Sequence, residues 1–342
     1  MKKFITNSKL FYHTEQFNSY MQHGEYSPIS FEVHPTNKCN QNCYYCSQKK
    51  ENAESMELEA FDRVVKFSKG FGVKSIYFSG GGEPCLNEHI WYGMRKASDA
   101  GLKIGIITNL SAALRAFNFT YIAKYCQWIR ISIDASDRRT YKKIRRVDSY
   151  DSVSDNIWSV FRSKKNFGSR TTIGLQVIPN KYTYWKIVHI VKSLRRQFPF
   201  VDYIQVRPIE LLLKNEPYTK FQLFVIGLQL KALSKINGVL LSDKWSMFGK
   251  ERKHGFRDCY ASFFLGTIVP NGDYYICCHT IGNESYRIGN IYMSPREFKR
   301  KFEKVTKKMI FCNTDICPVG CRGSVMNKSV NQLLNEPHKD FI

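Results

Sequence analysis

The chain has 342 residues, 43% of them apolar, which is enough for one large domain, a smaller one and a sizeable core. Lysine and arginine number 52 against 29 aspartates and glutamates, giving a net charge of +23 that would attract nucleic acid, anionic lipid or a phosphorylated substrate. There is no apolar run of about 18 residues, and no apolar stretch follows the basic start. We therefore expect no membrane span or signal peptide, and a cytoplasmic protein.

The basic residues are spread along the chain rather than gathered into one motif. Lysine-rich, solvated helix surfaces explain this distribution, and no aromatic-basic signature of an RNA-binding module is visible. Nucleic acid stays a possible partner but is not favoured.

The first 30 residues form a polar lead-in, and from residue 31 to about 236 apolar strand-like runs alternate with helix-like stretches. The runs are apolar on both faces, as buried parallel strands are, so the alternation predicts an α/β fold with right-handed crossovers. The expected strands are Phe31–His34, Lys74–Phe78, Lys103–Ile107, Trp128–Ile133, Thr172–Ile178 and Tyr203–Val206. The expected helices are Met56–Lys69, Glu88–Ala100, Phe119–Tyr125, Val153–Lys164 and Tyr184–Gln197.

The pattern changes near Asp243. Leu265–Val269 and Tyr274–Cys278 flank an Asn-Gly pair, which is a strong hairpin signal, and a basic amphipathic helix is expected at Pro295–Met309. We therefore divide the chain into a lead-in (1–30), a repeat domain (31–240) and a small C-terminal domain of hairpin plus helix (241–342).

The eleven cysteines cluster at 39–46 and at 259–321. A disulfide framework would imply secretion, for which the sequence gives no sign, so the clusters indicate two metal sites in a reducing compartment.

Cys39, Cys43 and Cys46 follow the first expected strand with the spacing Cys-x3-Cys-x2-Cys. Three thiolates can hold three irons of a cubane cluster and leave the fourth iron open to a ligand. The alternative is a zinc knuckle, but zinc sites usually complete four protein ligands. This spacing resembles that of the radical S-adenosylmethionine (radical SAM) enzymes. The resemblance implies a six-unit open partial barrel and a [4Fe–4S] cluster with S-adenosylmethionine (SAM) at its open iron, and the count of six βα units agrees.

The second expected strand ends in Ser79-Gly-Gly-Gly-Glu-Pro84. A glycine run alone is usually a tight turn, but one βα unit after the triplet it resembles the family's Gly-Gly-Glu-Pro motif. The resemblance implies that Gly81, Gly82, Glu83 and Pro84 hold the methionine amino group of SAM.

Further SAM contacts are implied at the ends of later strands. Asp134, with Ser132, resembles the ribose-binding position, although an aspartate there can also cap a helix. Asn109 matches a pocket-lining position, and Tyr45 matches the aromatic whose backbone contacts adenine. Arg145 lies where many members pair an arginine with the methionine carboxylate, but Arg146 competes for this role and the usual following glycine is missing.

The C-terminal cysteines resemble a SPASM or Twitch domain, which holds auxiliary iron–sulfur clusters. The resemblance implies that Cys259, Cys277, Cys317 and Cys321 ligate one auxiliary [4Fe–4S] cluster, with Cys312 an alternative ligand and a structural zinc the alternative metal. Cys278 and Cys312 are left over. They are buried thiols or, as in some family epimerases, hydrogen donors to a substrate radical. Cys85 and Cys126 fit core positions, and His34 fits a structural role.

The resemblance implies an enzyme that reductively cleaves SAM to a 5′-deoxyadenosyl radical, with electrons from a flavodoxin- or ferredoxin-type donor. A lead-in of 30 residues is too short for a peptide-recognition domain. We therefore expect a small polar substrate, sugar-like or aminocyclitol-like, oxidised by two electrons with the auxiliary cluster as acceptor, which makes the enzyme an oxidoreductase. The alternatives are an epimerase, a peptide maturase, an RNA-modifying enzyme and, outside catalysis, an iron–sulfur electron carrier. A carrier would have no need of Glu83 or Asp134.

Overall fold

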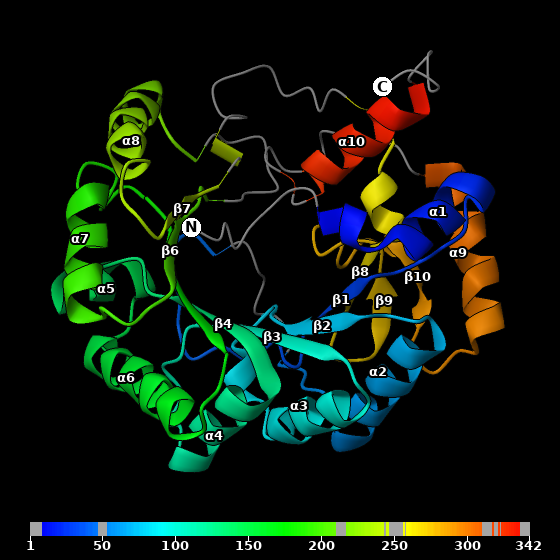
Figure 1. Ribbon diagram of the computed structural model, residues 1–342, viewed down its shortest axis with the longest axis horizontal. Coiled ribbons are helices and arrows are strands. Elements are labelled where there is room, and N and C mark those ends of the chain that lie inside the picture. Colours follow the sequence, from blue (N-terminus) through cyan, green and yellow to red (C-terminus); the bar gives the residue numbers. More distant parts are fainter. Residues whose placement is uncertain are drawn as a thin grey trace.

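The protein is described from a computed structural model. The structure describes residues 9–46, 53–209, 217–242, 244–245, 256, 258–309, 317, 321 and 323–335. A sheet of ten strands, in the order β10-β9-β8-β1-β2-β3-β4-β5-β6-β7, curves around the centre of the molecule and carries helices on its outer side (Figure 1). Strands β1 to β7 are parallel, and β8 is parallel to β1.

The strands are β1 (Ser30–Val33), β2 (Ser75–Phe78), β3 (Lys103–Thr108), β4 (Cys126–Ser132), β5 (Thr172–Val177), β6 (Tyr203–Val206), β7 (Val239–Leu241), β8 (Leu265–Ile268), β9 (Asp273–Tyr275) and β10 (Arg287–Asn290). The α-helices are α1 (Thr14–His23), α2 (Leu58–Gly70), α3 (Ile90–Asp99), α4 (Ala116–Tyr125), α5 (Arg138–Arg145), α6 (Tyr150–Asn166), α7 (Ile187–Gln197), α8 (Lys220–Leu233), α9 (Pro295–Met309) and α10 (Ser324–Asn335). No helix among these residues has the length and apolar character that a membrane crossing requires.

The predicted fold class is confirmed: the sheet is an open partial barrel. All six expected strands are present, shifted by at most two residues at either end, and α9 has its predicted bounds. Elements that the sequence pattern did not predict are α1, α5, α8, α10, β7 and β10. Helix α5 is one of these because it is short and mostly charged, so it has no visible apolar repeat.

The two faces of the barrel differ in polarity because side chains alternate along each strand. The outer face is apolar: Phe31 of β1, for example, is fully buried and its ring lies 5.8 Å from that of Phe67 in α2. The inner face carries polar and aromatic side chains, among them Glu32, Arg130 and Gln176. The helices therefore cover the hydrophobic layer, while the hollow of the barrel keeps groups that can bind a polar molecule.

The C-terminal hairpin extends the same sheet, since β8 pairs with β1. An aromatic cluster packs the C-terminal part against the barrel. The ring centroids of Tyr26 and Phe302 of α9 are 4.1 Å apart, and the Tyr26 hydroxyl lies 2.6 Å from that of Tyr274. The boundary near residue 240 stays a prediction, and the sheet is continuous across it.

Phe31→Ala should lower the free energy of unfolding by about 3–5 kcal/mol, because a fully buried ring leaves a cavity between β1, α2 and β9. Chemical denaturation measures the change. The matched control is Phe117→Ala, since Phe117 is 49% exposed and its loss should cost less than about 1 kcal/mol. Equal losses in both variants would contradict the packing described.

Candidate functional site

Two loops meet at the carboxyl edge of β1 and β2. The N–H of Gly82 donates to the carbonyl of Thr36 at 3.0 Å, and the N–H of Glu83 donates to that of Lys38 at 2.8 Å. A Cβ on Gly82 would lie 2.0 Å from the Lys38 carbonyl oxygen, so only glycine permits this approach. The glycine motif therefore sits directly against the loop that carries the cysteine triplet.

A cavity of about 200 Å³ opens where these loops meet. All three cysteines of the triplet line it, and so do the predicted SAM contacts other than Asp134: Tyr45, Gly81, Gly82, Glu83, Pro84, Asn109, Ser132 and Arg145. The parallel strands deliver these residues from β1 to β4 to a single edge of the sheet.

Glu83 is held rigidly at the cavity wall. One carboxylate oxygen accepts from the Thr108 hydroxyl and, at 3.0 Å, from the Cys85 N–H, and the other accepts from the Asn109 N–H at 2.6 Å. Burial raises the pKa of Glu83, and these hydrogen bonds oppose the rise. Its carboxylate is thus fixed next to the cysteine loop, where it can bind a cationic amino group.

Asp134 lies behind the cavity wall and is fully buried. Asp134 Oδ2 forms an ion pair with Arg145, whose Nη2 lies 2.6 Å away, and the Asp134 oxygens accept from the Tyr45 hydroxyl and, at 2.8 Å, from the Ile178 N–H. A buried charge pair of this kind fixes both side chains in place. Its predicted contact with the SAM ribose stays a prediction, and in this structure Arg145 and Tyr45 stand nearer the cavity.

The cysteine loop is anchored to the end of α5. The backbone N–H groups of Asn42 and Tyr44 donate to the carbonyls of Arg145 and Ile144, at 3.1 and 3.2 Å. Arg145 Nη1 lies 3.4 Å from Cys43 Sγ. A helix that the sequence pattern did not predict therefore supports the predicted triplet.

The geometry suits the expected cofactors. Three cysteines line one cavity, and three thiolates can hold three irons of a cluster whose fourth iron stays open. A fixed carboxylate and an arginine line the same cavity and can bind the amino and carboxylate groups of an amino acid.

Two of the C-terminal cysteines, Cys259 and Cys321, lie near the N-terminus of α10. Asn327 is buried and lies 3.7 Å from Cys259 Sγ, and its side-chain oxygen accepts from the Ala261 N–H at 2.7 Å. Burial, with Cys259 and Cys317 nearby, raises the pKa of the Cys321 thiol to about 12. Cys259, Cys317 and Cys321 thus lie within electrostatic range of one another, and Cys312 lies outside the described residues.

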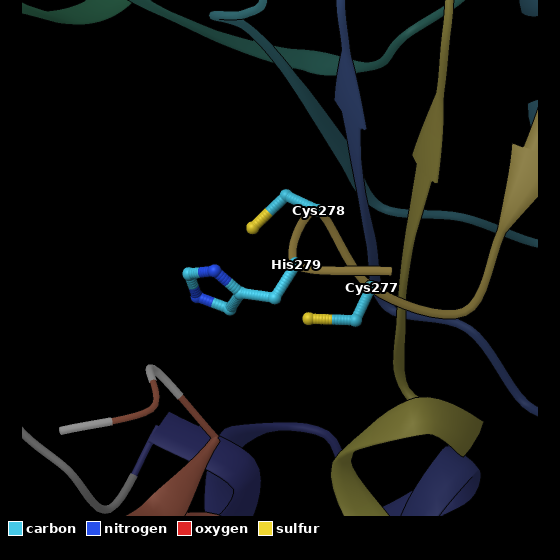
Figure 2. A group of neighbouring side chains, drawn as sticks. All are labelled: Cys277, Cys278 and His279. Carbon is cyan, nitrogen blue, oxygen red and sulfur yellow. The ribbon is translucent and has the colours of Figure 1, made fainter. Parts of the chain in front are cut away.

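Cys277, Cys278 and His279 form a turn after β9. Their ligand atoms lie within 4.8 Å of one another, and all three side chains project to the same side (Figure 2). His279 was not predicted as a ligand. Cys259 precedes β8 and Cys277 follows antiparallel β9, so both lie at the edge where β1 begins. The second cysteine group is therefore at the opposite end of the barrel from the triplet.

Three other predicted positions are buried. Burial raises the pKa of the Cys85 thiol and raises that of Cys126 to about 12, as inert core thiols require. His34 Nε2 lies 3.1 Å from a carboxylate oxygen of Glu32, which fits its structural role.

Cavity-lining residues that sequence reasoning missed include Gln41, Gln176 and Ile178. Gln176 lies near the carboxyl end of β5, as Ser132 lies at the carboxyl end of β4. Position at the end of a strand could therefore have indicated it. Gln41 lies inside the cysteine triplet. Neither belongs to a motif that the sequence displays.

Comparison with known proteins agrees with this geometry. The family model of the radical SAM superfamily matches residues 33–194. Residues 33–194 form a radical SAM domain. The cofactors of this domain are a [4Fe–4S] cluster and SAM, and the predicted place for both is the cavity that the triplet lines.

Curated relatives match in part. A probable GTP 3′,8-cyclase of Saccharolobus islandicus (strain M.14.25 / Kamchatka #1) is 29% identical over 126 residues, covering 36% of this chain and 41% of the relative. The molybdenum cofactor biosynthesis protein moc-5 of Caenorhabditis elegans is 26% identical over 302 residues, covering 79% of this chain and 46% of that protein. The matches thus span less than half the length of these relatives.

Solved structures share the radical SAM fold. SuiB of Streptococcus suis, bound to S-adenosylmethionine, has a TM-score of 0.64 at 16% identity, covering 94% of this chain and 80% of that one. A tagged form of anSMEcpe with bound AdoMet has a TM-score of 0.60 at 16% identity, covering 82% of this chain and 83% of that one. At such identities the likeness concerns the fold.

Replacing Cys39, Cys43 and Cys46 together with alanine should remove about half the iron of the reconstituted protein and all SAM cleavage. The remaining iron would belong to the C-terminal group, so wild type should bind about eight irons. Iron analysis and chromatographic measurement of 5′-deoxyadenosine test this. Continued formation of 5′-deoxyadenosine by the triple variant would refute the assignment of the triplet.

Glu83→Gln should weaken SAM binding about tenfold to a hundredfold with iron content unchanged, since a charge-assisted hydrogen bond contributes about 1.5–3 kcal/mol. Titration of SAM into the reconstituted protein measures this. Glu88→Gln is the matched control, because the Glu88 side chain is 86% exposed. Wild-type affinity in Glu83→Gln would place the amino group of SAM elsewhere.

Asp134→Ala should also weaken SAM binding while leaving iron content intact, because Asp134 orients the two cavity residues Tyr45 and Arg145. Removing one partner of a buried pair should in addition lower the free energy of unfolding by about 3–5 kcal/mol. The same titration and a denaturation curve test both effects. A variant with unaltered SAM affinity would show that the pair has no part in the cofactor site.

Proposed function

We propose that this protein is a radical SAM oxidoreductase acting on a small polar metabolite, sugar-like or aminocyclitol-like. When bound and reduced, the cluster and SAM supply a 5′-deoxyadenosyl radical that abstracts hydrogen from carbon. The observation that carries the proposal is the single cavity that gathers the triplet, Glu83 and Arg145 at the carboxyl edge of the sheet. A flavodoxin- or ferredoxin-type protein is the proposed electron donor.

The chain's own residues bind and orient. Glu83, fixed by three hydrogen bonds, holds the amino group of SAM, and Arg145 offers the opposite charge for its carboxylate. The inner face of the barrel, with its buried polar side chains, holds the substrate below.

Cys259, Cys277, Cys317 and Cys321 would hold an auxiliary [4Fe–4S] cluster, which supplies an electron acceptor. Two observations support this. The thiols of Cys259, Cys317 and Cys321 lie close enough to affect one another's charge. They also lie at the edge of the barrel opposite the triplet, so the inner face separates the two metal groups. A substrate there would stand between the site of hydrogen abstraction and an acceptor for the second electron.

A second candidate is epimerisation, with Cys278 as hydrogen donor. It is supported by the position of Cys278, which is partly exposed in the same turn as Cys277. Cyclisation of a nucleotide is a third candidate, and it rests on the partial likeness to probable GTP 3′,8-cyclases. Peptide modification is a fourth, because SuiB, which shares the fold, has been solved bound to its precursor peptide SuiA.

Replacing Cys259 with serine should preserve 5′-deoxyadenosine formation and abolish oxidised product, because only the acceptor is removed. Turnover in heavy water separates the candidates. A dehydrogenase gives a product oxidised by two electrons and free of solvent deuterium. A deuterated product at the oxidation level of the substrate, lost in Cys278→Ala, would replace oxidation with epimerisation.

A further inference from the structure

The cysteine triplet lies at the surface of the protein as well as in the cofactor cavity. Cys46 is exposed, and Cys39 and Cys43 are partly exposed, while all three line the cavity. Electrons for a cluster held here must come from outside the chain, and the rate of electron transfer falls steeply with distance. A donor protein therefore has to dock on the residues around this loop.

Two segments flank the cysteine loop. One is the end of α5, whose carbonyls accept hydrogen bonds from the backbone N–H groups of the loop. The other, residues 180–186, follows β5. The Lys181 N–H donates to the Tyr44 hydroxyl of the loop at 3.1 Å, and Lys186 Nζ donates to Thr140 Oγ1 of α5 at 2.9 Å. The loop, α5 and the segment after β5 therefore form one continuous surface.

Helix α5 gives this surface a strong positive charge. It contains five basic residues and no acidic one. Arg139 and Lys143 are exposed and lie one turn apart, and the exposed Arg146 follows at the end of the helix that the cysteine loop contacts. Lys142 instead pairs with Asp148 at 3.1 Å. Arg139, Lys143 and Arg146 therefore present a row of positive charge that leads to the loop.

The segment after β5 adds a cation and aromatic rings on the other side of the loop. Lys181 is exposed, and its Nζ lies 4.8 Å from the ring centroid of Tyr44 and 5.1 Å from that of Tyr182. Trp185, in the same segment, is 54% exposed, and its ring lies 4.9 Å from that of Tyr184. Tryptophan, tyrosine and arginine are the residues in which protein–protein interfaces are enriched. The surface thus combines an exposed aromatic anchor with a basic rim.

We propose that Arg139, Lys143, Arg146, Lys181 and Trp185 form a docking face for an acidic one-electron donor protein. Complementary charge draws such a partner to the cysteine loop and orients its redox group over it. The reduced donor loses one electron, which the cluster gains, and no atom crosses the face. Electron-transfer complexes are small and transient, which suits a face of a few exposed residues. The proposal rests on the proposed function, whose electron donor it provides with a binding surface.

Binding of an oxidised, acidic flavodoxin to the reconstituted protein tests the face without turnover, and a ferredoxin serves as the second probe. Calorimetric titration at low salt should show binding by wild type that weakens as sodium chloride is added. Lys143→Glu and Lys181→Glu, on the two sides of the loop, should each weaken it about tenfold, because they place like charges opposite each other. Lys165→Glu is the matched control: Lys165 is exposed at the end of α6, shortly before β5 begins, and so lies at the opposite edge of the sheet.

Electron delivery is measured in parallel, as 5′-deoxyadenosine formed from SAM. With limiting flavodoxin, reduced by NADPH and its reductase, Lys143→Glu and Lys181→Glu should slow this formation about tenfold, in line with their lost affinity. With dithionite, a small reductant that needs no docking, both variants should match wild type, because neither residue lines the cofactor cavity. Lys165→Glu should match wild type with either reductant.

Equal affinity for the donor in wild type and both face variants would overturn the docking face. An equal loss in Lys165→Glu would do so too, since it would show that only the overall charge matters, and so would a wild type that binds neither flavodoxin nor ferredoxin. Absence of 5′-deoxyadenosine from wild type with dithionite would instead refute the proposed function. Its presence with dithionite, together with unaltered donor binding in the variants, would refute the docking face alone.

Discussion

One backbone contact holds the cofactor site together, namely the approach of the loop after β2 to the loop after β1. The carbonyls of Thr36 and Lys38 accept from the backbone of Gly82 and Glu83, and a single methyl group at Gly82 would prevent it. The contact fixes the distance between the cysteine loop and Glu83. A cofactor that touches both a metal and a carboxylate needs that distance to be constant, because small displacements of reacting groups are costly in rate. Parallel pairing of β1 with β2 brings the two loops to the same edge in the first place.

The open barrel also explains how charged groups persist in the interior. A closed barrel of this size fills its centre with branched apolar side chains. Here the sheet stays open at β7 and β10 in the described part of the chain, and its hollow holds Glu32 and Arg130. Each has a hydrogen-bond partner on the inner face, which offsets part of the cost of burial. The apolar contacts that stabilise the fold lie on the outer face, under the helices. Polar side chains on the inner face can therefore change without loss of the hydrophobic core.

The sequence predicted those features that depend on neighbouring residues alone, namely apolar runs and short motifs. Apolar runs predicted six strands because buried parallel strands are apolar on both faces, and the motifs located the triplet and Glu83. Helix α5 was missed because its residues are charged, although Arg145 at its end supports the cysteine loop. The orientation of Asp134 could not be predicted either. Its left-handed backbone and its bonds to Tyr45 and Arg145 depend on three separate elements. Gln176 and Gln205 belong to no motif, and only the pairing of β4, β5 and β6 brings them beside Arg207 and Arg130.

The sheet also relates the two groups of cysteines. Strand β8 runs parallel to β1 and β9 returns beside it, so Cys277 emerges at the edge where β1 begins, while the triplet follows the end of β1. The triplet follows β1, and Cys259 and Cys277 flank the neighbouring strands β8 and β9, so the inner face of the sheet lies between the two groups. The proposed electron acceptor would use this arrangement, since a substrate bound on the inner face would lie between the two groups of cysteines. The burial of Cys321 also affects how this thiol binds metal. A thiol with a raised pKa must lose its proton to bind metal, so metal binding at Cys321 should release a proton and strengthen as the pH rises.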